Sequence, residues 1–380
     1  MLYVGITMAL TGADAEEALL ETDGALLAIE EANAGGGIAG FRIEPVILNN
    51  ATPVAGQYDP VQAANARNLV ANPGVVANIG PENSGAGRAM APILSYGDLA
   101  TVSPSTADPD ITDPKTASTY RPKGRPVYFR TCTTNTYQGP GVANFFVDRL
   151  RLRSVFVLDD FGPYGVSLAD TFQRHAAKRG MKVLGREQLN PRETDYAAEL
   201  TKIQARAPEA IFYGGSAKVG VKLAKQSYEL LPNVVKGAGG GMYKSDVLRG
   251  AGFPVLSGWY VSAVAPHLLD APQAQRWVDR FVARWGKQPG DYTLTAYDAA
   301  LVVLNAIRRV AESRQAVNRH TVREAIQQTH LPTLQGVIVF DANGDLLSRA
   351  ITIFQIVLDP SFPFDDVRHQ YRYIGPAPPG

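Results

Sequence analysis

The residues best suited to chemistry in this sequence are small hydroxyl side chains that follow apolar, strand-like runs. Ser84, in the segment Asn83-Ser84-Gly85, comes after such a run at Val75–Gly80 and just before a helical pattern. Its hydroxyl and the amides that follow can bind a carboxylate, because the N-terminus of a helix carries partial positive charge. The alternative interpretation is a plain helix N-cap, which uses the same geometry. We favour an anion contact at Ser84.

Motifs of the common enzyme classes are absent or incomplete. The run Gly237–Gly241 follows a strand, as a dinucleotide-binding loop would, but Met242 stands where the final glycine belongs. Neither a phosphate-binding loop nor Gly-x-Ser-x-Gly occurs, and the five histidines show no metal spacing. Asp159-Asp160 lacks a second carboxylate motif, so we interpret it as a solvated loop pair. We expect no enzyme, no cofactor and no metal site.

Length and charge narrow the classes of function further. A chain of 380 residues exceeds what one hydrophobic core usually organises, so we expect two domains. The formal net charge is +1, without long runs of one sign, which argues against binding to nucleic acid or to an anionic membrane. No stretch reaches the roughly 18 apolar residues that span a bilayer. A small molecule is the expected ligand of this soluble chain.

Short β-branched runs alternate with helical patterns, which is typical of parallel βαβ units and predicts an α/β fold. A helix over Ala18–Asn33 would place Ala18, Ala25, Ile29 and Ala32 on one face, to lie on a sheet. In the first half, strands are expected at Tyr3–Met8, Phe41–Leu48, Val75–Gly80, Ala100–Ser103 and Val127–Thr131. These units predict a doubly wound sheet, covered by helices on both faces.

The pattern restarts near Gln138 and predicts a second doubly wound sheet of similar size. Its strands are expected at Ser154–Asp159, Lys182–Gly185, Ala210–Tyr213 and Gly258–Val264. The remaining elements are more than one domain needs: helices at Ala271–Trp285, Leu294–Ser313 and Thr321–His330, and a hairpin-like pair at Gly336–Phe340 and Ala350–Val357. We expect lobe 1 from 1–133 plus 265–342, lobe 2 from 134–264 plus 343–380, and a three-segment hinge near 131–136, 262–266 and 343–348.

Several short sequence motifs together resemble the type I periplasmic binding proteins of the leucine/isoleucine/valine-binding group, and the resemblance covers nearly the whole chain. The motifs include Gly5-Ile6-Thr7-Met8-Ala9-Leu10-Thr11-Gly12, Ala28-Ile29-Glu30-Glu31-Ala32-Asn33, Ser103-Pro104-Ser105, Tyr128-Phe129-Arg130-Thr131, Tyr164-Gly165 and Tyr213-Gly214-Gly215. Their order and spacing, taken together, are specific.

This resemblance implies two lobes that close on a small ligand and deliver it to the membrane permease of an ABC transporter. We accordingly expect a monomer that works in the periplasm. A cytoplasmic sensor of amides or amino acids, built on the same fold, is the runner-up, and an enzyme is third.

The resemblance also implies ligand contacts at particular residues. The serine that matches Ser84 binds the ligand carboxylate in the family, and Ser105 with Thr106 follows the next strand, at the loop that holds the same group. The family threonine there is replaced by Ala107, so Thr106 would have to substitute for it. Tyr164 matches a lobe 2 tyrosine that reaches the ligand.

Departures from the family pattern bear on which ligand is bound. Acids that would pair with a ligand ammonium are replaced by Tyr137 and by the glycines Gly239, Gly240 and Gly241, and Ser216 replaces an aromatic residue. Glu17 is the one remaining acid expected near the ligand, although a solvated glutamate at a helix start is the plainer interpretation.

Because a buried ammonium without a carboxylate is costly, these departures favour a carboxylate without an α-ammonium. An aromatic acid would fit, with the glycines giving room for a ring. A branched-chain or other amino acid is the alternative.

Overall fold

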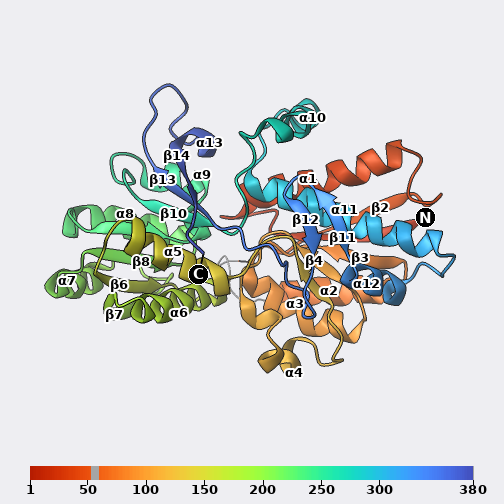
Figure 1. Cartoon of the computed structure of the whole chain (residues 1–380), viewed down its shortest axis with the longest axis horizontal. Helices are drawn as coiled ribbons and strands as arrows, with labels where there is room; N and C mark the ends of the chain where they lie inside the picture. Colours follow the sequence, from red (N-terminus) through yellow and green to blue (C-terminus); the bar gives the residue numbers. More distant parts are fainter. Residues whose placement is uncertain (53–59, 380) are drawn as a thin grey trace. The chain divides into compact units, whose positions relative to one another are not determined.

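The computed structural model describes residues 1–52 and 60–379, which fall into two compact units. Unit 1 contains the described residues up to Thr133 together with His267–Arg349, and unit 2 contains Thr134–Pro266 together with the residues from Ala350 onward. Over this part of the chain, the backbone passes between the units at 133–134, 266–267 and 349–350 (Figure 1). The last of these crossings comes just after the segment 343–348 that the sequence suggested.

Unit 1 is built on a parallel sheet in the order β2-β1-β3-β4-β5. The strands are β1 (Leu2–Met8), β2 (Ile43–Asn49), β3 (Val75–Ile79), β4 (Thr101–Ser103) and β5 (Tyr128–Arg130). All five were predicted, with ends that differ by at most two residues. Strand β2 lies on one side of β1 and β3 lies on the other, so the strand order reverses at β1. The loops that follow β1 and β3 therefore diverge at this point of the sheet.

Unit 1 has helices on both faces of this sheet, and others, such as α4 (Ala117–Tyr120) and α10 (Gln275–Trp285), that pack on those helices. They are α1 (Ala15–Ala34), α2 (Pro60–Ala71), α3 (Ser84–Tyr96), α4 (Ala117–Tyr120), α10 (Gln275–Trp285), α11 (Asp291–Glu312) and α12 (Arg319–Gln327). Residues of α1 and α11 pack with Val4 and Ile6 of β1, whereas residues of α2 and α3 pack with Val75 on the opposite side. The alternation of side chains along a strand produces these two separate cores.

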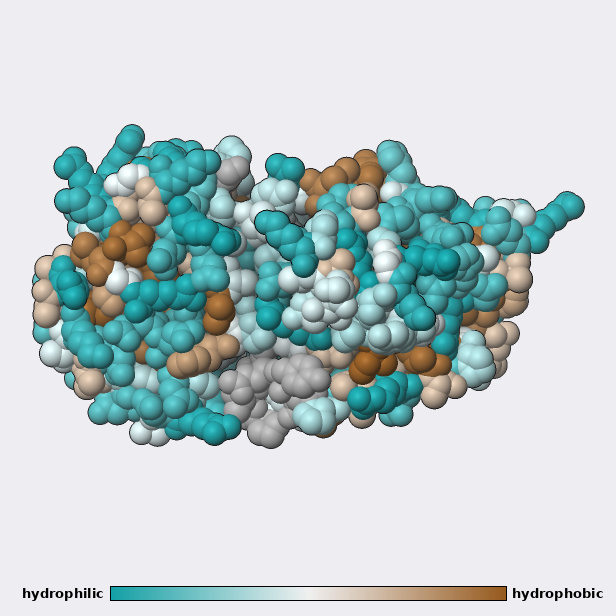
Figure 2. All heavy atoms as spheres, turned by 90° about the horizontal axis from the view of Figure 1, so that it is seen from below, coloured by the Kyte–Doolittle hydropathy of each residue, from teal (hydrophilic) through white to brown (hydrophobic). Residues whose placement is uncertain are grey.

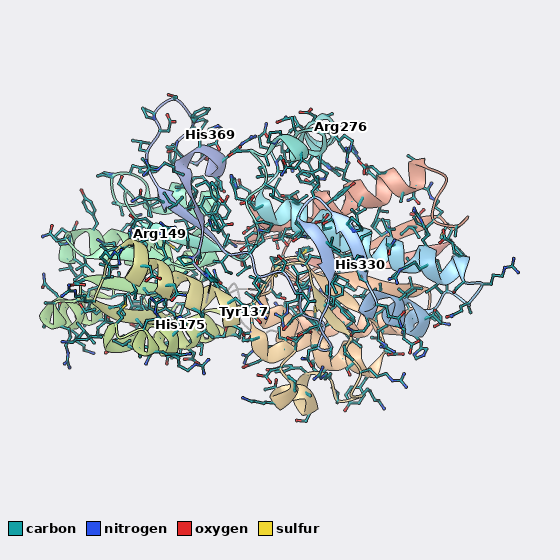
Figure 3. All side chains as sticks on the ribbon, in the orientation of Figure 1. Tyr137, Arg149, His175, Arg276, His330 and His369 are labelled. Carbon is teal, nitrogen blue, oxygen red and sulfur yellow. The ribbon has the colours of Figure 1, made fainter. Side chains whose placement is uncertain are left out.

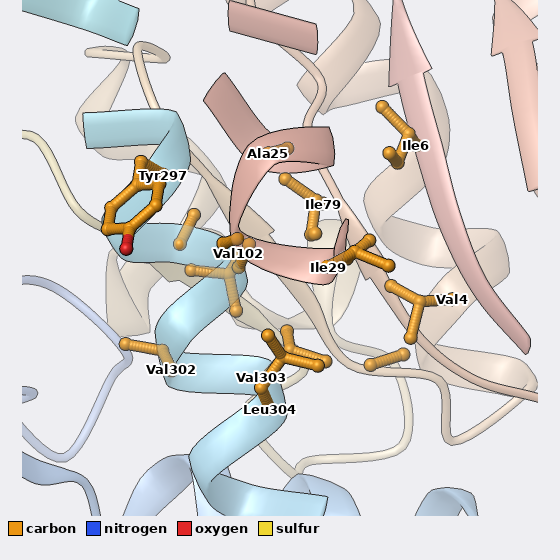
Figure 4. Packing of buried hydrophobic residues seen from close by; sticks show 14 of the residues in the cluster. Val4, Ile6, Ala25, Ile29, Ile79, Val102, Tyr297, Val302, Val303 and Leu304 are labelled. Atoms are coloured by element: carbon orange, nitrogen blue, oxygen red, sulfur yellow. The ribbon is translucent and has the colours of Figure 1, made fainter. Parts of the chain in front are cut away.

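The contact between α1 and α11 forms the centre of the larger core (Figure 4). Ala18, Ala25 and Ile29 of α1 are buried, which confirms the face predicted from their spacing. The two helices approach closely at Gly24, where an added Cβ would lie 2.4 Å from the carbonyl oxygen of Thr293. A side chain at position 24 would therefore push α11 away from α1.

Unit 2 has a sheet in the order β14-β13-β10-β9-β8-β6-β7, in which β13 and β14 run antiparallel to the rest. The strands are β6 (Ser154–Asp159), β7 (Lys182–Gln188), β8 (Ala210–Gly214), β9 (Val235–Ala238), β10 (Tyr260–Ala263), β13 (Thr352–Ile356) and β14 (Tyr371–Pro376). In this sheet β7 and β8 lie on opposite sides of β6, so the strand order reverses at β6. The α/β fold with two doubly wound sheets is thus confirmed.

The helices of unit 2 are α5 (Asn135–Asn144), α6 (Pro163–Lys178), α7 (Ala197–Arg206), α8 (Ala217–Leu230), α9 (Ser245–Ala251) and α13 (Val367–Gln370). Residues of α5 and α6 pack with a cluster of aromatic rings. Phe172 of α6 stacks on Phe212 of β8 with ring centroids 3.8 Å apart, and Phe146 contacts both rings edge-on. This cluster joins the helix layer to the middle of the sheet.

The predicted late hairpin is wrong. The strand β12 (Gly336–Val339) pairs with β11 (His330–Thr333) inside unit 1, and β13 pairs with β10 and β14 inside unit 2. The turn at 341–344 thus does not join two paired strands. Each of the two apolar runs finds its partner in a different unit.

No described helix is both long and apolar enough to cross a membrane. On the face shown in Figure 2, hydrophobic residues form separate patches among hydrophilic ones.

A buried acid in unit 1 predicts that stability depends on pH. Asp298 of α11 is fully buried and accepts a hydrogen bond from Gln335 Nε2 at 2.8 Å, and burial raises its pKa to about 7. Because the folded protein favours the protonated carboxyl, stability should fall as the pH rises from about 4 to 7, by at most about 1.4 kcal/mol per pH unit. Asp298→Asn should flatten this dependence in urea unfolding at several pH values.

The exposed Asp279→Asn on α10 serves as its control and should leave the slope unchanged. An unaltered slope in Asp298→Asn would show that Asp298 is not the titrating group.

Candidate functional site

The predicted unit 1 residues follow the carboxyl ends of neighbouring strands. Glu17 lies in the first turn of α1 after β1, Ser84 begins α3 after β3, and Ser105 and Thr106 follow β4. In open α/β sheets, ligands bind at this edge, beside the position where the strand order reverses. The order β2-β1-β3 places that position between the loop of Glu17 and the loop of Ser84.

Ser84 is not the cap of α3. Asn83 is the N-cap, because its Oδ1 accepts a hydrogen bond from the amide of Ala86 at 2.8 Å. Ser84 is 2% exposed, and its Oγ accepts from the amide of Asp108 at 3.3 Å, so its own hydroxyl proton remains available to donate. The first turn of α3 holds no acid, and its N-cap Asn83 is neutral, although Asn83 Nδ2 donates to the carboxylate of the preceding Glu82 at 2.6 Å.

Hydrogen bonds tie the loop after β3 to the loop after β4. Ser103 Oγ donates to the carbonyl oxygen of Pro81 at 2.6 Å, and Ser105 Oγ lies 3.0 Å from that of Glu82. The bond from the Asp108 amide to Ser84 adds a third connection. These two loops therefore hold Ser84 and Ser105 as parts of one surface.

Ser105 also contacts Glu21, an acid that was not among the predicted site residues. Its Oγ lies 2.9 and 3.0 Å from the two carboxylate oxygens of Glu21, which is 1% exposed on α1. Glu17, one turn earlier, is half-buried. The spacing could have revealed Glu21, because it falls between Ala18 and Ala25 on the apolar face of the helix.

Thr106 faces the interior of unit 1. Its side chain is fully buried, and its Oγ1 lies 2.8 Å from Ser103 Oγ and 3.0 Å from the hydroxyl of Tyr128. Its amide donates to Ser103 Oγ at 3.1 Å. With both polar groups used inside the unit, this arrangement does not favour the predicted ligand contact through the Thr106 hydroxyl.

A buried arginine fixes the loop that carries Thr106. Arg130 of β5 is completely buried and donates to the carbonyl oxygens of Thr106 and Asp108 at 3.0 and 2.8 Å. It also donates to Thr112 Oγ1 and to the carboxylate of Asp345, both at 2.7 Å. This single side chain thus connects the loop after β4 to Asp345 in the late segment of unit 1.

In unit 2, an acid of the protein itself is hydrogen-bonded to the N-termini of α6 and α8. The carboxylate of Asp160 accepts a hydrogen bond from the amide of Ser216 at 2.7 Å and another from the amide of Gly162 at 3.2 Å. Ser216 is the N-cap of α8, and Gly162 is the N-cap of α6. Asp160 is 5% exposed, and burial raises its pKa. Asp159 is buried as well and pairs with Arg186 at 2.6 Å. The interpretation of these two acids as a solvated loop pair is thus wrong, because both serve internal hydrogen bonds.

The glycines after β9 are needed for packing inside unit 2. The hydroxyl of Tyr164 accepts the amide of Gly240 at 2.7 Å, and burial raises the tyrosine pKa to about 12. A Cβ at Gly239 would lie 2.5 Å from that hydroxyl, and one at Gly241 only 1.9 Å from the carbonyl oxygen of Gly215. An added Cβ at Gly239 or Gly241 would thus meet protein atoms, whereas room for a ligand ring beside these glycines stays a prediction.

Tyr137 lies in the first turn of α5 and is half-buried (Figure 3). Nδ2 of Asn135, in the same turn, donates to the carbonyl oxygen of Tyr164 at 3.2 Å, so the starts of α5 and α6 are neighbours. Tyr137, Tyr164, Ser216, Gly239 and Gly240 thus belong to one edge of the unit 2 sheet. Their contact with a ligand stays a prediction.

The described residues contain no group of three or more His, Cys, Asp or Glu side chains that could hold a metal ion. His175, His330 and His369 lie on different elements, as Figure 3 shows. At this edge of its sheet, unit 1 presents the hydroxyls of Ser84 and Ser105, the N-terminus of α3 and the carboxylate of Glu21.

Comparisons with known proteins agree with this architecture. A sequence model of the periplasmic binding protein family matches residues 2–360. The leucine-, isoleucine-, valine-, threonine-, and alanine-binding protein of Pseudomonas aeruginosa is 27% identical over 356 residues, which cover 93% of this chain and 89% of that protein.

Solved structures are similar over nearly the full length. The branched-chain amino acid transporter substrate-binding protein LivJ from Streptococcus pneumoniae, in complex with isoleucine, has a TM-score of 0.80 at 22% identity and covers 99% of both chains. A solute-binding protein of an ABC transporter from R. palustris, in complex with benzoate, has a TM-score of 0.77 at 17% identity and covers 100% of this chain and 96% of that one. At these identities the likeness concerns the fold.

Proposed function

The chain belongs to the periplasmic binding protein family, whose sequence model matches residues 2–360, and we propose that it captures a small carboxylate for an ABC importer. It would work in the periplasm as a monomer, and would pass its ligand unchanged to a membrane permease. Relatives and structural neighbours are binding proteins of the branched-chain amino acid transporter type.

The N-terminus of α3 is the observation that carries the proposal of a carboxylate. Ser84 can donate its hydroxyl proton there, and the first turn of the helix holds no acid. In unit 2, the starts of α6 and α8 are already bonded to Asp160. An anionic group of the ligand is therefore best stabilised in unit 1.

A ligand without an α-ammonium is the form we favour. The turn after β9 consists of Gly239, Gly240 and Gly241, and the carboxylate of Asp160 accepts backbone amides. A buried ammonium that lacks a carboxylate partner costs several kcal/mol. A neighbour of the same fold that holds benzoate supports this choice.

An amino acid is the second candidate, because Glu21 places a buried carboxylate beside Ser105. The names of the relatives, which bind leucine, isoleucine and valine, also favour it. Calorimetry of the ligand-free protein with leucine, with benzoate and with the primary amide of each tests both candidates. Amides that bind as tightly as the acids would contradict the carboxylate proposal, and leucine binding much tighter than benzoate would favour the second candidate.

Ser84→Ala should weaken the binding of the carboxylate ligand by about 1–3 kcal/mol, because it removes one hydrogen bond to a charged group. Isothermal titration with the tightest acid of that panel would measure the change.

Ser95→Ala is a matched control from the other end of α3, since Ser95 is equally buried and its Oγ accepts the amide of Lys123 at 3.2 Å. Its affinity should equal that of the parent protein. Equal losses in both variants would mean that Ser84 acts on the fold alone.

A further inference from the structure

Exposed cationic side chains gather at one end of the unit 2 sheet. Two segments supply them, residues 149–153 before β6 and residues 178–182 before β7. The amide of Lys182 donates to the carbonyl oxygen of Arg153 at 2.8 Å, so the two segments are neighbours. We call their exposed cations the basic patch, which consists of Arg149, Arg151, Arg153, Lys178, Arg179 and Lys182.

The first segment alternates arginine with leucine, and this pattern turns its arginines outward. Leu150 and Leu152 pack on the core of unit 2, and their amides donate to carbonyl oxygens of the preceding turn at 3.1 and 3.0 Å. Arg151, between them, has a φ angle of +59°, in the left-handed region that favours glycine. Because a long charged side chain is kept at a position where glycine would be less strained, the charge itself points to a role.

Two acids in this region leave most of the positive charge uncompensated. Asp148 pairs with Arg179 at 2.8 Å, and this hydrogen bond lowers the pKa of Asp148, as do the charges of Arg151 and Arg149. Glu209 accepts backbone amides at the start of β6. Six cations against two acids leave a local surplus of four positive charges, whereas the whole chain carries +1. The sequence shows no run of one sign here, because separate segments supply the charges.

The basic patch lies away from the predicted ligand contacts of unit 2. Strands β6, β7 and β8 are parallel, so the segments before β6 and β7 lie at their amino ends. Tyr164 and Ser216 follow the carboxyl ends of β6 and β8. The six residues of β6 span about 20 Å between these two edges. A partner bound at the basic patch therefore leaves the ligand loops of unit 2 free.

We propose that the basic patch attaches the protein to an anionic membrane surface. Clusters of this size bind the phosphates of anionic lipids, and arginine can form two hydrogen bonds to one phosphate. Among the described residues, the large exposed hydrophobic side chains lie outside both segments. The patch thus has no aromatic surface on which nucleic acid bases would stack, and no apolar anchor that would enter the bilayer.

The attachment is therefore electrostatic and reversible. It goes beyond the proposed function, in which the protein passes its ligand to a membrane permease, because it adds a contact with the lipid itself. Such a contact would keep the protein close to the membrane while its ligand loops stay accessible.

Sedimentation of the whole protein with lipid vesicles tests the proposal. Vesicles of roughly 30% phosphatidylglycerol in phosphatidylcholine should bind the protein about 10-fold or more tighter than vesicles of phosphatidylcholine alone. Because salt screens exposed charges, raising sodium chloride from about 50 to about 500 mM should abolish this difference. Equal binding to both kinds of vesicle, or binding that resists salt, would overturn the proposal.

A double charge reversal, Arg149→Glu with Lys178→Glu, changes one cation in each segment. Its affinity for the anionic vesicles should fall by about 25-fold or more, since each cation near such a surface contributes about fivefold. Within the described residues neither side chain forms an ion pair, so the fold should be retained. Calorimetry with leucine and with benzoate should match the parent protein, which separates this proposal from that of carboxylate capture.

The matched control is Arg276→Glu with Lys225→Glu, which makes the same change in net charge on exposed faces of α10 and α8 (Figure 3). Its vesicle affinity should stay within about twofold of the parent value. Equal losses in both double variants would mean that net charge alone acts, and would refute a specific patch. Polyglutamate or duplex DNA bound as tightly as the anionic vesicles would refute the membrane as the partner.

Discussion

Arg130→Met is expected to destabilise unit 1 by about 3–5 kcal/mol, because removing one partner of a buried ion pair typically costs this much. The variant removes the guanidinium that donates to the Asp345 carboxylate and to the carbonyl oxygens of Thr106 and Asp108. Because this loop also holds the Asp108 amide against Ser84, ligand affinity should fall together with stability. Urea unfolding without ligand, followed by calorimetry under native conditions, measures the two effects.

The same substitution at an exposed pair provides the control. Arg42 is 68% exposed and bonds to Glu44 at 2.5 Å, so Arg42→Met should change stability by less than about 1 kcal/mol. If the two variants unfold at the same urea concentration, the network around Arg130 does not support unit 1 as described.

Gly241→Ala is expected to destabilise unit 2 by about 2–4 kcal/mol. The added Cβ would lie 1.9 Å from the carbonyl oxygen of Gly215, and neither atom belongs to a flexible side chain. The strain would displace Gly215 and the neighbouring cap of α8 at Ser216. Thermal and urea unfolding of the ligand-free protein would detect it.

Gly35→Ala is the matched control, since the φ angle there is −75° and the nearest atom to an added Cβ lies at 3.5 Å. Alanine at such a position costs little and can stabilise through the unfolded chain. If Gly241→Ala is as stable as Gly35→Ala, the backbone at Gly215 can move away from the added Cβ at little cost in free energy.

The sequence was sufficient to predict those parts of the fold that depend on local patterns. Each strand of the first sheet appears as a short apolar run, and the buried face of α1 follows from the spacing of Ala18, Ala25 and Ile29. Strand partners depend on distant segments, so the pairing of β13 with β10 and β14 could not be predicted this way. An apolar run shows that a strand is buried, but not which sheet it joins.

The candidate site was predicted to a similar extent. Strand-to-helix junctions placed Ser84 and Ser105 correctly at one edge of the sheet, because parallel strands end there together. The roles of the acids were missed. Residue type does not reveal that Asp160 bonds to two amides, or that Glu21 lies behind Ser105, since both follow from how separate loops meet.

The division of each unit between separate segments of the chain has a consequence for biosynthesis. Unit 1 lacks α11, the partner of α1, until residues 291–312 have been made, and unit 2 lacks β13 and β14 until residues 352–376 have been made. Neither core can therefore close until these late segments have been synthesised. Nascent chains should stay open to chaperones until late in translation, unlike proteins whose domains fold one after another.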